Sequence, residues 1–344
     1  MLKFIDKIPS VSVVIATYNG EKYLKEQLDS IITQTYPIYE IIISDDQSTD
    51  GTMQVVEEYS NKYPYVKGFV KPIKNGLNEN FMYGFSKATG DYIAYCDQDD
   101  IWLPTKIEVQ MAAIENNLMC ISTSRDFWND DKDNLLQEKS FFMQKRMSLE
   151  HCILEMSMGS GHNMIFKKEL FQIIDKYKIV DKTWPIDAYL GIIADCYGGY
   201  KVINNVLVLN RRLSCSVSVF IDSQSIGINR VQRIRKKIIS IIKGDVDKKI
   251  RQNIHYFQNI FDTLPNATNT SHCAYLCNLY LKKGLFARLV FHKHYFQNCD
   301  LIICNPSKNK AKRFLQYLYL VYCISRVIIS PKSKYWEQRY FGKL

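Results

Sequence analysis

The chain has 344 residues, of which 47% are hydrophobic and 13% aromatic, a composition that excludes global disorder and allows one or two sizeable cores. Its net charge of +10 is unevenly distributed. Residues 1–213 carry 23 Lys and Arg against 29 Asp and Glu, a net charge of −6, whereas residues 214–344 carry 22 against 6, a net charge of +16. This asymmetry predicts two modules, 1–213 and 214–344, that have different partners.

The amino-terminal segment and the cysteines indicate the compartment. Charged residues interrupt the apolar positions of residues 1–9, so we expect no secretory signal. The ten cysteines include no Cys-x-x-Cys pair, which argues against a zinc site or a disulfide framework. A cytoplasmic location is therefore expected.

From residue 11 onward, short apolar runs alternate with segments of helical spacing. Strands are predicted at 11–16, 40–44, 66–70, 92–96 and 119–124, and helices at 21–33, 52–62, 79–88 and 104–117. A further helix and strand are predicted at 188–197 and 201–209. The alternation predicts an α/β domain with a mostly parallel sheet flanked by helices.

Polar residues gather where the predicted strands end. They are Thr17 and Tyr18, Asp45 and Asp46, Lys74 and Asn75, and Asp97 to Asp100. Ligands of parallel sheets bind outside the carboxyl ends of the strands, so we expect these residues to converge on one crevice. The last group holds three carboxylates in four residues, which repel one another and favour a divalent cation, Mg²⁺ or Mn²⁺, that also carries phosphate oxygens. The sequence thus predicts a site for a charged nucleotide ligand.

Three motifs in order extend this interpretation. They are Val-Ser-Val-Val-Ile-Ala-Thr-Tyr-Asn at 11–19, Ile-Ser-Asp-Asp-Gln-Ser-Thr-Asp-Gly-Thr at 43–52, and Gly-Asp-Tyr-Ile-Ala-Tyr-Cys-Asp-Gln-Asp-Asp-Ile-Trp at 90–102. Together they resemble the inverting nucleotide-sugar glycosyltransferases of family 2, which have the GT-A fold, and weaker matches extend the resemblance to about Arg212. The third motif resembles the branch that makes bacterial capsule and O-antigen glycans, which includes rhamnosyltransferases.

The resemblance implies roles for the strand-end residues. Tyr18, with the adjacent Thr17, and Asp46 would hold the base of a UDP- or dTDP-sugar. The segment 74–80 resembles the family's loop over the base and ribose, and its candidate contacts are Lys74, Asn75 and Asn80. Asp99 would be the metal ligand, Asp97 would contact the ribose or the metal, and Asp100 would support them.

A catalytic base is implied within Thr183-Trp184-Pro185-Ile186-Asp187-Ala188-Tyr189, and Asp187 is the candidate. Inversion requires a carboxylate that removes the proton of the acceptor hydroxyl as the hydroxyl attacks. Relatives often end this region with Tyr-Arg-x-His, but Leu213 stands here in place of the His. Arg211 or Arg212 would then neutralise the diphosphate.

Each candidate also has a plainer structural interpretation. The acids at 97–100 could form a solvated turn, Asp46 and Asp187 could cap helices, and Tyr18 could belong to the core. His162 follows a glycine-rich segment and could line the donor or acceptor pocket, or it could be a structural histidine. Arg211 and Arg212 could simply lie at a solvated strand end.

The basic second module is expected to be mainly helical and to associate with a membrane. Residues 228–252 mix basic and apolar positions as an amphipathic helix on an anionic surface would, and residues 314–325 carry no charge but are too few to span a bilayer. No nucleic-acid-recognition motif accompanies the charge, so no nucleic-acid partner is expected.

These observations predict a metal-dependent transferase that moves a sugar onto a lipid-linked saccharide at the inner face of the cell membrane. Two alternatives remain. A sugar nucleotidyltransferase would need a glycine-rich, basic phosphate loop after the first strand, which residues 16–21 lack. A catalytically inactive membrane scaffold with this fold is favoured only by Leu213.

Overall fold

The computed structural model describes residues 8–128, 130–132, 135–139, 160–180, 185–213, 258 and 260–264. The predicted amphipathic helix, the apolar run near the carboxyl terminus, and Trp184 lie outside these residues. Within the described residues, no helix is both long enough and apolar enough to cross a membrane.

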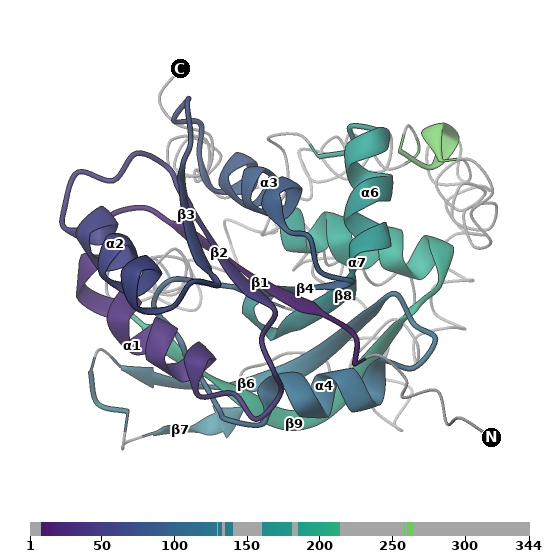
Figure 1. Ribbon diagram of the computed structural model, residues 1–344. Helices are drawn as coiled ribbons and strands as arrows, with labels where there is room; N and C mark the ends of the chain where they lie inside the picture. Colours follow the sequence, from purple (N-terminus) through teal and green to yellow (C-terminus); the bar gives the residue numbers. More distant parts are fainter. Residues whose placement is uncertain are drawn as a thin grey trace, which may run out of the picture.

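The amino-terminal part alternates strands and helices as predicted (Figure 1). Its elements are β1 (Val11–Thr17), α1 (Glu21–Ile32), β2 (Glu40–Asp45), α2 (Thr52–Lys62), β3 (Val66–Val70), α3 (Leu77–Lys87) and β4 (Tyr92–Cys96). β1 pairs in parallel with both β2 and β4, and β2 pairs in parallel with β3. The carboxyl ends of these strands therefore share one edge of the sheet.

The remaining elements add antiparallel pairs to the sheet. They are β5 (Ile101–Trp102), α4 (Lys106–Ile114), β6 (Met119–Trp128), β7 (Leu135–Lys139), η1 (Gly161–Asn163), β8 (Met164–Lys167), α6 (Lys168–Lys176), α7 (Ile186–Tyr197) and β9 (Tyr200–Arg212). β8 runs antiparallel to β4 and β6, whereas β9 is parallel to β6 and antiparallel to β5. The strand order is β3-β2-β1-β4-β8-β6-β9-β5, with β7 beside β6.

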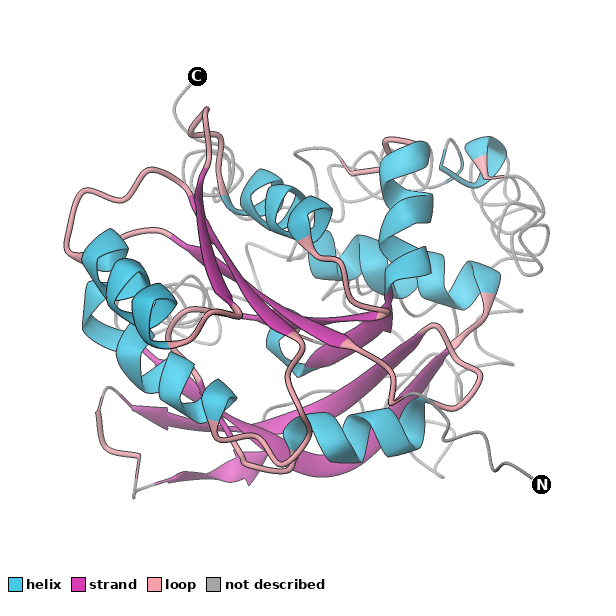
Figure 2. Cartoon of the chain, viewed as in Figure 1, coloured by secondary structure: helices cyan, strands magenta, loops and turns pink. Residues whose placement is uncertain are grey.

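Helices cover both faces of the sheet, which explains why the central strands are continuous apolar runs (Figures 1 and 2). Val13 and Ile15 of β1 lie in a core cluster with residues of α1, α2 and α4. Val14 and Ala16 point the other way, into a cluster with α3, α6 and α7. The α/β fold with a sheet flanked by helices is thus confirmed, and its strictly parallel part is the β3-β2-β1-β4 half.

A short segment of the basic module belongs to this core. Ile260, Phe261 and Leu264 are at most 6% exposed and lie in the cluster that contains α3, α6 and α7. This segment therefore contributes apolar surface to the sheet domain. The division of the chain at residue 213 stays a prediction, because most of the second module lies outside the described residues.

Candidate active site

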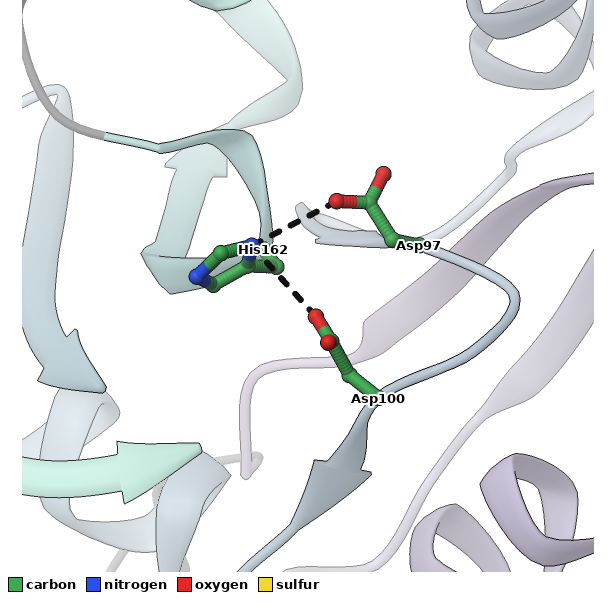
Figure 3. Close-up of side chains that lie close together, drawn as sticks. All are labelled: Asp97, Asp100 and His162. Carbon is green, nitrogen blue, oxygen red and sulfur yellow. Dashed lines mark hydrogen bonds and ion pairs between the residues drawn. The ribbon is translucent and has the colours of Figure 1, made fainter. Parts of the chain in front are cut away.

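The acid turn, residues Asp97–Asp100, joins β4 to β5 at the carboxyl end of β4. His162 of η1 enters the same space, because η1 leads into β8 and β8 pairs with β4. Its Nδ1 atom lies 3.4 Å from Asp97 Oδ2 and 3.3 Å from Asp100 Oδ2 (Figure 3). Its Nε2 atom lies 3.2 Å from Ser124 Oγ on β6. Two carboxylates and one imidazole therefore converge at the sheet edge.

Contacts from two neighbouring segments hold the acid turn in place. The main-chain N–H of Tyr18 donates to Gln98 Oε1 at 2.9 Å, and Gln98 Nε2 donates back to the Tyr18 carbonyl at 3.3 Å. The main-chain N–H of Arg211 donates to Asp100 Oδ1 at 3.0 Å, and its Nε donates to the Asp99 carbonyl at 2.9 Å. The turn is thus fixed between the end of β1 and the end of β9.

Three acidic side chains are crowded in the acid turn, and this crowding makes Asp99 and Asp100 harder to ionise. Burial, reinforced by the charges of Asp100 and Asp97, raises the pKa of Asp99 to about 8. Burial also raises the pKa of Asp100 to about 6, although His162 counteracts it. Burial acts to lower the pKa of His162, but Asp100 and Asp97 outweigh it and raise this pKa above its ordinary value. Carboxylates held together in this way favour a bound cation.

The donor atoms of the cluster fit a divalent metal ion. One ligand atom each from Asp97, Asp100 and His162 lies within 4.8 Å of the other two. Asp100 Oδ2 is buried and receives no hydrogen bond from the described residues. Carboxylate oxygens suit Mg²⁺ and Mn²⁺, and an imidazole nitrogen is an accepted ligand of transition metals. Asp99, a predicted ligand, is not part of this group, and its metal role stays a prediction.

The candidate base, Asp187, lies in the first turn of α7, whose N-cap residue is Pro185. Its Oδ1 atom accepts from the main-chain N–H of Ala188 at 2.8 Å, and its Oδ2 atom accepts from that of Gly161 at 3.2 Å. Burial, with added repulsion from Asp97, raises the pKa of Asp187 to about 6. A carboxylate with a pKa of about 6 is ionised at neutral pH and basic enough to accept a proton.

Asp46 anchors the loop that follows β3. Its Oδ1 atom lies 3.0 Å from Lys71 Nζ, and both groups are buried. Its Oδ2 atom accepts from the main-chain N–H of Gly76 at 3.0 Å, and Oδ1 accepts from that of Asn75 at 3.3 Å. Lys71 also donates to the Asn75 side chain. Asp46 therefore lies beside a buried ammonium group, a neighbour that sequence reasoning did not identify.

Lys74 of this loop contacts Tyr18 at the protein surface. Tyr18 is 44% exposed, so it is not a core residue. Lys74 Nζ lies 2.7 Å from the Tyr18 hydroxyl and 3.9 Å from the centroid of its ring. The Tyr18 ring is thus exposed at the end of β1, with the Lys74 ammonium over it, and its contact with a nucleotide base stays a prediction.

Thr17 and Asn80, two further candidate nucleotide contacts, are buried and connect neighbouring elements. Thr17 Oγ1 donates to Asp45 Oδ1 at 2.8 Å. Asn80 Oδ1 accepts from Ser44 Oγ at 2.6 Å, and its Nδ2 donates to the Thr17 carbonyl at 3.0 Å. Asn80 is 1% exposed and Thr17 is fully buried. Both side chains join β1, β2 and α3, so a direct contact with nucleotide stays a prediction for each.

The two arginines at the end of β9 have different surroundings. The Arg211 guanidinium is buried and forms ion pairs with Glu26 and Asp130, at 2.5 and 2.9 Å. Arg212 is more exposed, and its Nε donates to Asp126 Oδ2 at 2.8 Å. A diphosphate contact stays a prediction for both residues.

Comparison with known proteins identifies the family. The sequence model described as glycosyl transferase family 2 matches residues 12–174. The chain is also 30% identical, over 215 residues, to uncharacterized glycosyltransferase MJ1057 of Methanocaldococcus jannaschii, a match that covers 61% of this chain and 73% of that protein. The chain belongs to glycosyl transferase family 2. The acid turn and Asp187 are therefore the candidate catalytic centre of a family 2 glycosyltransferase.

Two further relatives match shorter stretches of this glycosyltransferase. Putative glycosyltransferase EpsE of Bacillus subtilis is 39% identical over 113 residues, which are 32% of this chain and 40% of EpsE. The dTDP-rhamnosyl transferase RfbG of Shigella flexneri is 33% identical over 184 residues, which are 51% of this chain and 61% of RfbG. The chain thus matches less than two thirds of the length of either relative.

A solved structure supports the fold of this glycosyltransferase. The structure of S. aureus TarS residues 1–349 in complex with UDP-GlcNAc aligns with a TM-score of 0.53 at 17% sequence identity. The alignment covers 97% of this chain and 95% of that one. At this identity the likeness concerns the fold, and the GT-A fold expected from the sequence is confirmed.

Proposed function

We propose that this family 2 glycosyltransferase transfers a sugar, with inversion, from a UDP- or dTDP-sugar to a lipid-linked saccharide, with Mn²⁺ or Mg²⁺ at the acid turn. The observation that carries the proposal is the convergence of Asp97, Asp100 and His162 at the sheet edge that also holds Asp46 and Asp187. When bound, the cation would stabilise the negative charge of the departing nucleoside diphosphate.

Residues of the chain would accept the proton and bind the nucleotide. Asp187 would accept the proton of the attacking hydroxyl, and its two main-chain hydrogen bonds hold its carboxylate in one orientation. Tyr18 would stack on the base, and Asp46 would accept from a base N–H. Lys74, Asn75 and Arg212 would contact the ribose and diphosphate. An intact acid turn and a carboxylate held by two main-chain hydrogen bonds favour an enzyme over an inactive scaffold.

The polysaccharide role and the place in the cell rest on other observations. EpsE is described as a putative glycosyltransferase and RfbG as a dTDP-rhamnosyl transferase, and their likeness to this chain favours a deoxyhexose or hexose donor. The +16 charge of residues 214–344 favours an anionic surface. A cytoplasmic enzyme on the inner membrane face, working in capsule or O-antigen synthesis, is consistent with both.

The pair of Asp46 and Lys71 predicts which nucleotide bases the donor site prefers, and this preference can be measured. Uracil and thymine carry an N3–H that can donate to Asp46 and an adjacent carbonyl that can accept from Lys71. Cytosine has an acceptor nitrogen at the same place, which would leave the buried carboxylate facing a lone pair. We therefore expect UDP and dTDP to bind at least about 5-fold, and up to about 150-fold, more tightly than CDP, corresponding to about 1–3 kcal/mol.

A thermal-shift titration of the full chain with UDP, dTDP, CDP and GDP, each with Mn²⁺, measures this preference. A ligand at a hundred times its dissociation constant adds about 2.7 kcal/mol to the free energy of unfolding. Equal shifts with UDP and CDP would remove Asp46 from base recognition. The absence of a shift with any of the four nucleotides would contradict the proposed donor site itself.

A further inference from the structure

The guanidinium group of Arg211, at the end of β9, contacts two aromatic rings and two carboxylates. Its guanidinium carbon lies over the rings of Tyr23 and Phe127, at 4.6 and 4.7 Å from their centroids. Its Nη2 atom lies 2.5 Å from Glu26 Oε2, and its Nη1 atom lies 2.9 Å from Asp130 Oδ1. The group is 2% exposed, although both acidic partners reach solvent. A planar guanidinium that contacts two rings and two carboxylates at once is held in one orientation.

This fixed guanidinium holds two consecutive residues of the acid turn. Its Nε donates to the Asp99 carbonyl at 2.9 Å, and the main-chain N–H of Arg211 donates to Asp100 Oδ1 at 3.0 Å. The same residue therefore sets the path of the main chain at Asp99 and the rotamer of Asp100. Asp100 Oδ2, the oxygen left over, is the one that faces His162 at 3.3 Å.

We propose that Arg211 is a positioning residue that, through Glu26 of α1 and Asp130, fixes the acid turn in the geometry that binds the divalent cation. Arg211 then acts on the cation through Asp99 and Asp100 and does not itself contact the diphosphate. The inference deepens the proposed function, because the cation readout described below rests on the proposed metal role of the acid turn. Groups that orient metal ligands commonly affect metal affinity almost as strongly as the ligands do.

Arg211→Lys tests the proposal because it keeps the positive charge and removes the fork. A lysine ammonium is a point charge on a flexible stem, so it cannot hold Glu26, Asp130 and the Asp99 carbonyl at once. Glu26→Gln removes the negative charge from one arm of the fork and keeps its shape, so that this arm is weakened to a neutral hydrogen bond. It carries the test if Arg211→Lys does not fold. The matched control is Lys25→Gln, which breaks the exposed Lys25–Glu58 ion pair one position earlier on α1.

The first readout is hydrogen–deuterium exchange of the metal-free full chain. We expect the peptide covering residues 97–103 to exchange roughly tenfold faster, or more, in Arg211→Lys than in the wild type, with a smaller increase in Glu26→Gln. Lys25→Gln should exchange like the wild type there. Unchanged exchange of this peptide in Arg211→Lys and Glu26→Gln would overturn the proposal.

The second readout is Mn²⁺ affinity, measured without nucleotide from the paramagnetic resonance signal of free Mn²⁺. Arg211→Lys should bind Mn²⁺ about 10–100-fold more weakly than the wild type, with Lys25→Gln unchanged. If the wild type binds no Mn²⁺ while the turn still loosens in Arg211→Lys, the metal role fails and the positioning role stands. If Arg211→Lys loses UDP affinity in the absence of metal with an unaltered turn, Arg211 is a diphosphate ligand and the proposal is wrong.

Discussion

Replacing Asp187 with Asn should lower the turnover of sugar transfer by roughly 10²–10⁴-fold, because an amide cannot accept the proton of the attacking hydroxyl. The Asn side-chain oxygen can still accept from the N–H groups of Ala188 and Gly161, so the first turn of α7 should be preserved. We therefore expect the affinity for nucleotide and the melting temperature to remain close to those of the wild type. Steady-state kinetics with thermal unfolding measures all three quantities.

The pH dependence of the wild type gives an independent check on the same residue. A general base acts only when it is ionised, so turnover should fall as the pH drops through the pKa of Asp187, which burial raises to about 6. A cation bound at the acid turn would offset the repulsion from Asp97 and move this limb to lower pH. The limb should disappear in Asp187→Asn. A loss of nucleotide binding or of folding in this variant would instead assign Asp187 a structural role.

Replacing Asp100 with Asn should weaken Mn²⁺ binding by about 10–100-fold or more and abolish metal-dependent transfer. The buried Oδ2 atom receives no hydrogen bond from the described residues, and it faces His162 within the three-residue cluster. Asp99→Asn is made in parallel. The structure indicates Asp100 as a metal ligand, whereas the family resemblance implies Asp99, and the two variants distinguish these assignments. The structure favours a larger loss of Mn²⁺ affinity in Asp100→Asn.

Both substitutions keep the size of the side chain, so we expect the melting temperature to stay close to that of the wild type. Lost Mn²⁺ binding would then reflect a lost ligand and not a lost fold. Full Mn²⁺ affinity in Asp100→Asn, combined with loss in Asp99→Asn, would restore Asp99 as the ligand and limit Asp100 to support of the turn. Full affinity in both variants would place the cation elsewhere.

The convergence of the strand ends could be predicted from the sequence because it depends only on local pattern and parallel pairing. The register aligns Thr17 with Asp45 and Ile15 with Cys96, so the residues after β1, β2 and β4 must meet at one edge. The helix boundaries were less accurate. α7 begins at Ile186 after Pro185, so Asp187 lies inside the first turn and is not the N-cap residue.

The partners of the acid turn could not be predicted, because they depend on long-range pairing. His162 reaches the turn through the antiparallel pairing of β8 with β4, whereas the sequence shows only a glycine-rich segment before it. Arg211 meets Glu26 across 185 positions of the chain, and no local pattern indicates that contact. Two short strands, β5 with two residues and β7 with five, were not among the predicted elements.

We propose above that sugar transfer from a UDP- or dTDP-sugar requires a divalent cation bound at the acid turn. The most direct measurement is the release of nucleoside diphosphate by the full chain from UDP- and dTDP-sugars, with Mn²⁺ and then with excess EDTA. We expect release, by transfer or slow hydrolysis, that requires Mn²⁺ and is lost in Asp100→Asn. Release that continues unchanged in EDTA and in Asp100→Asn would contradict it.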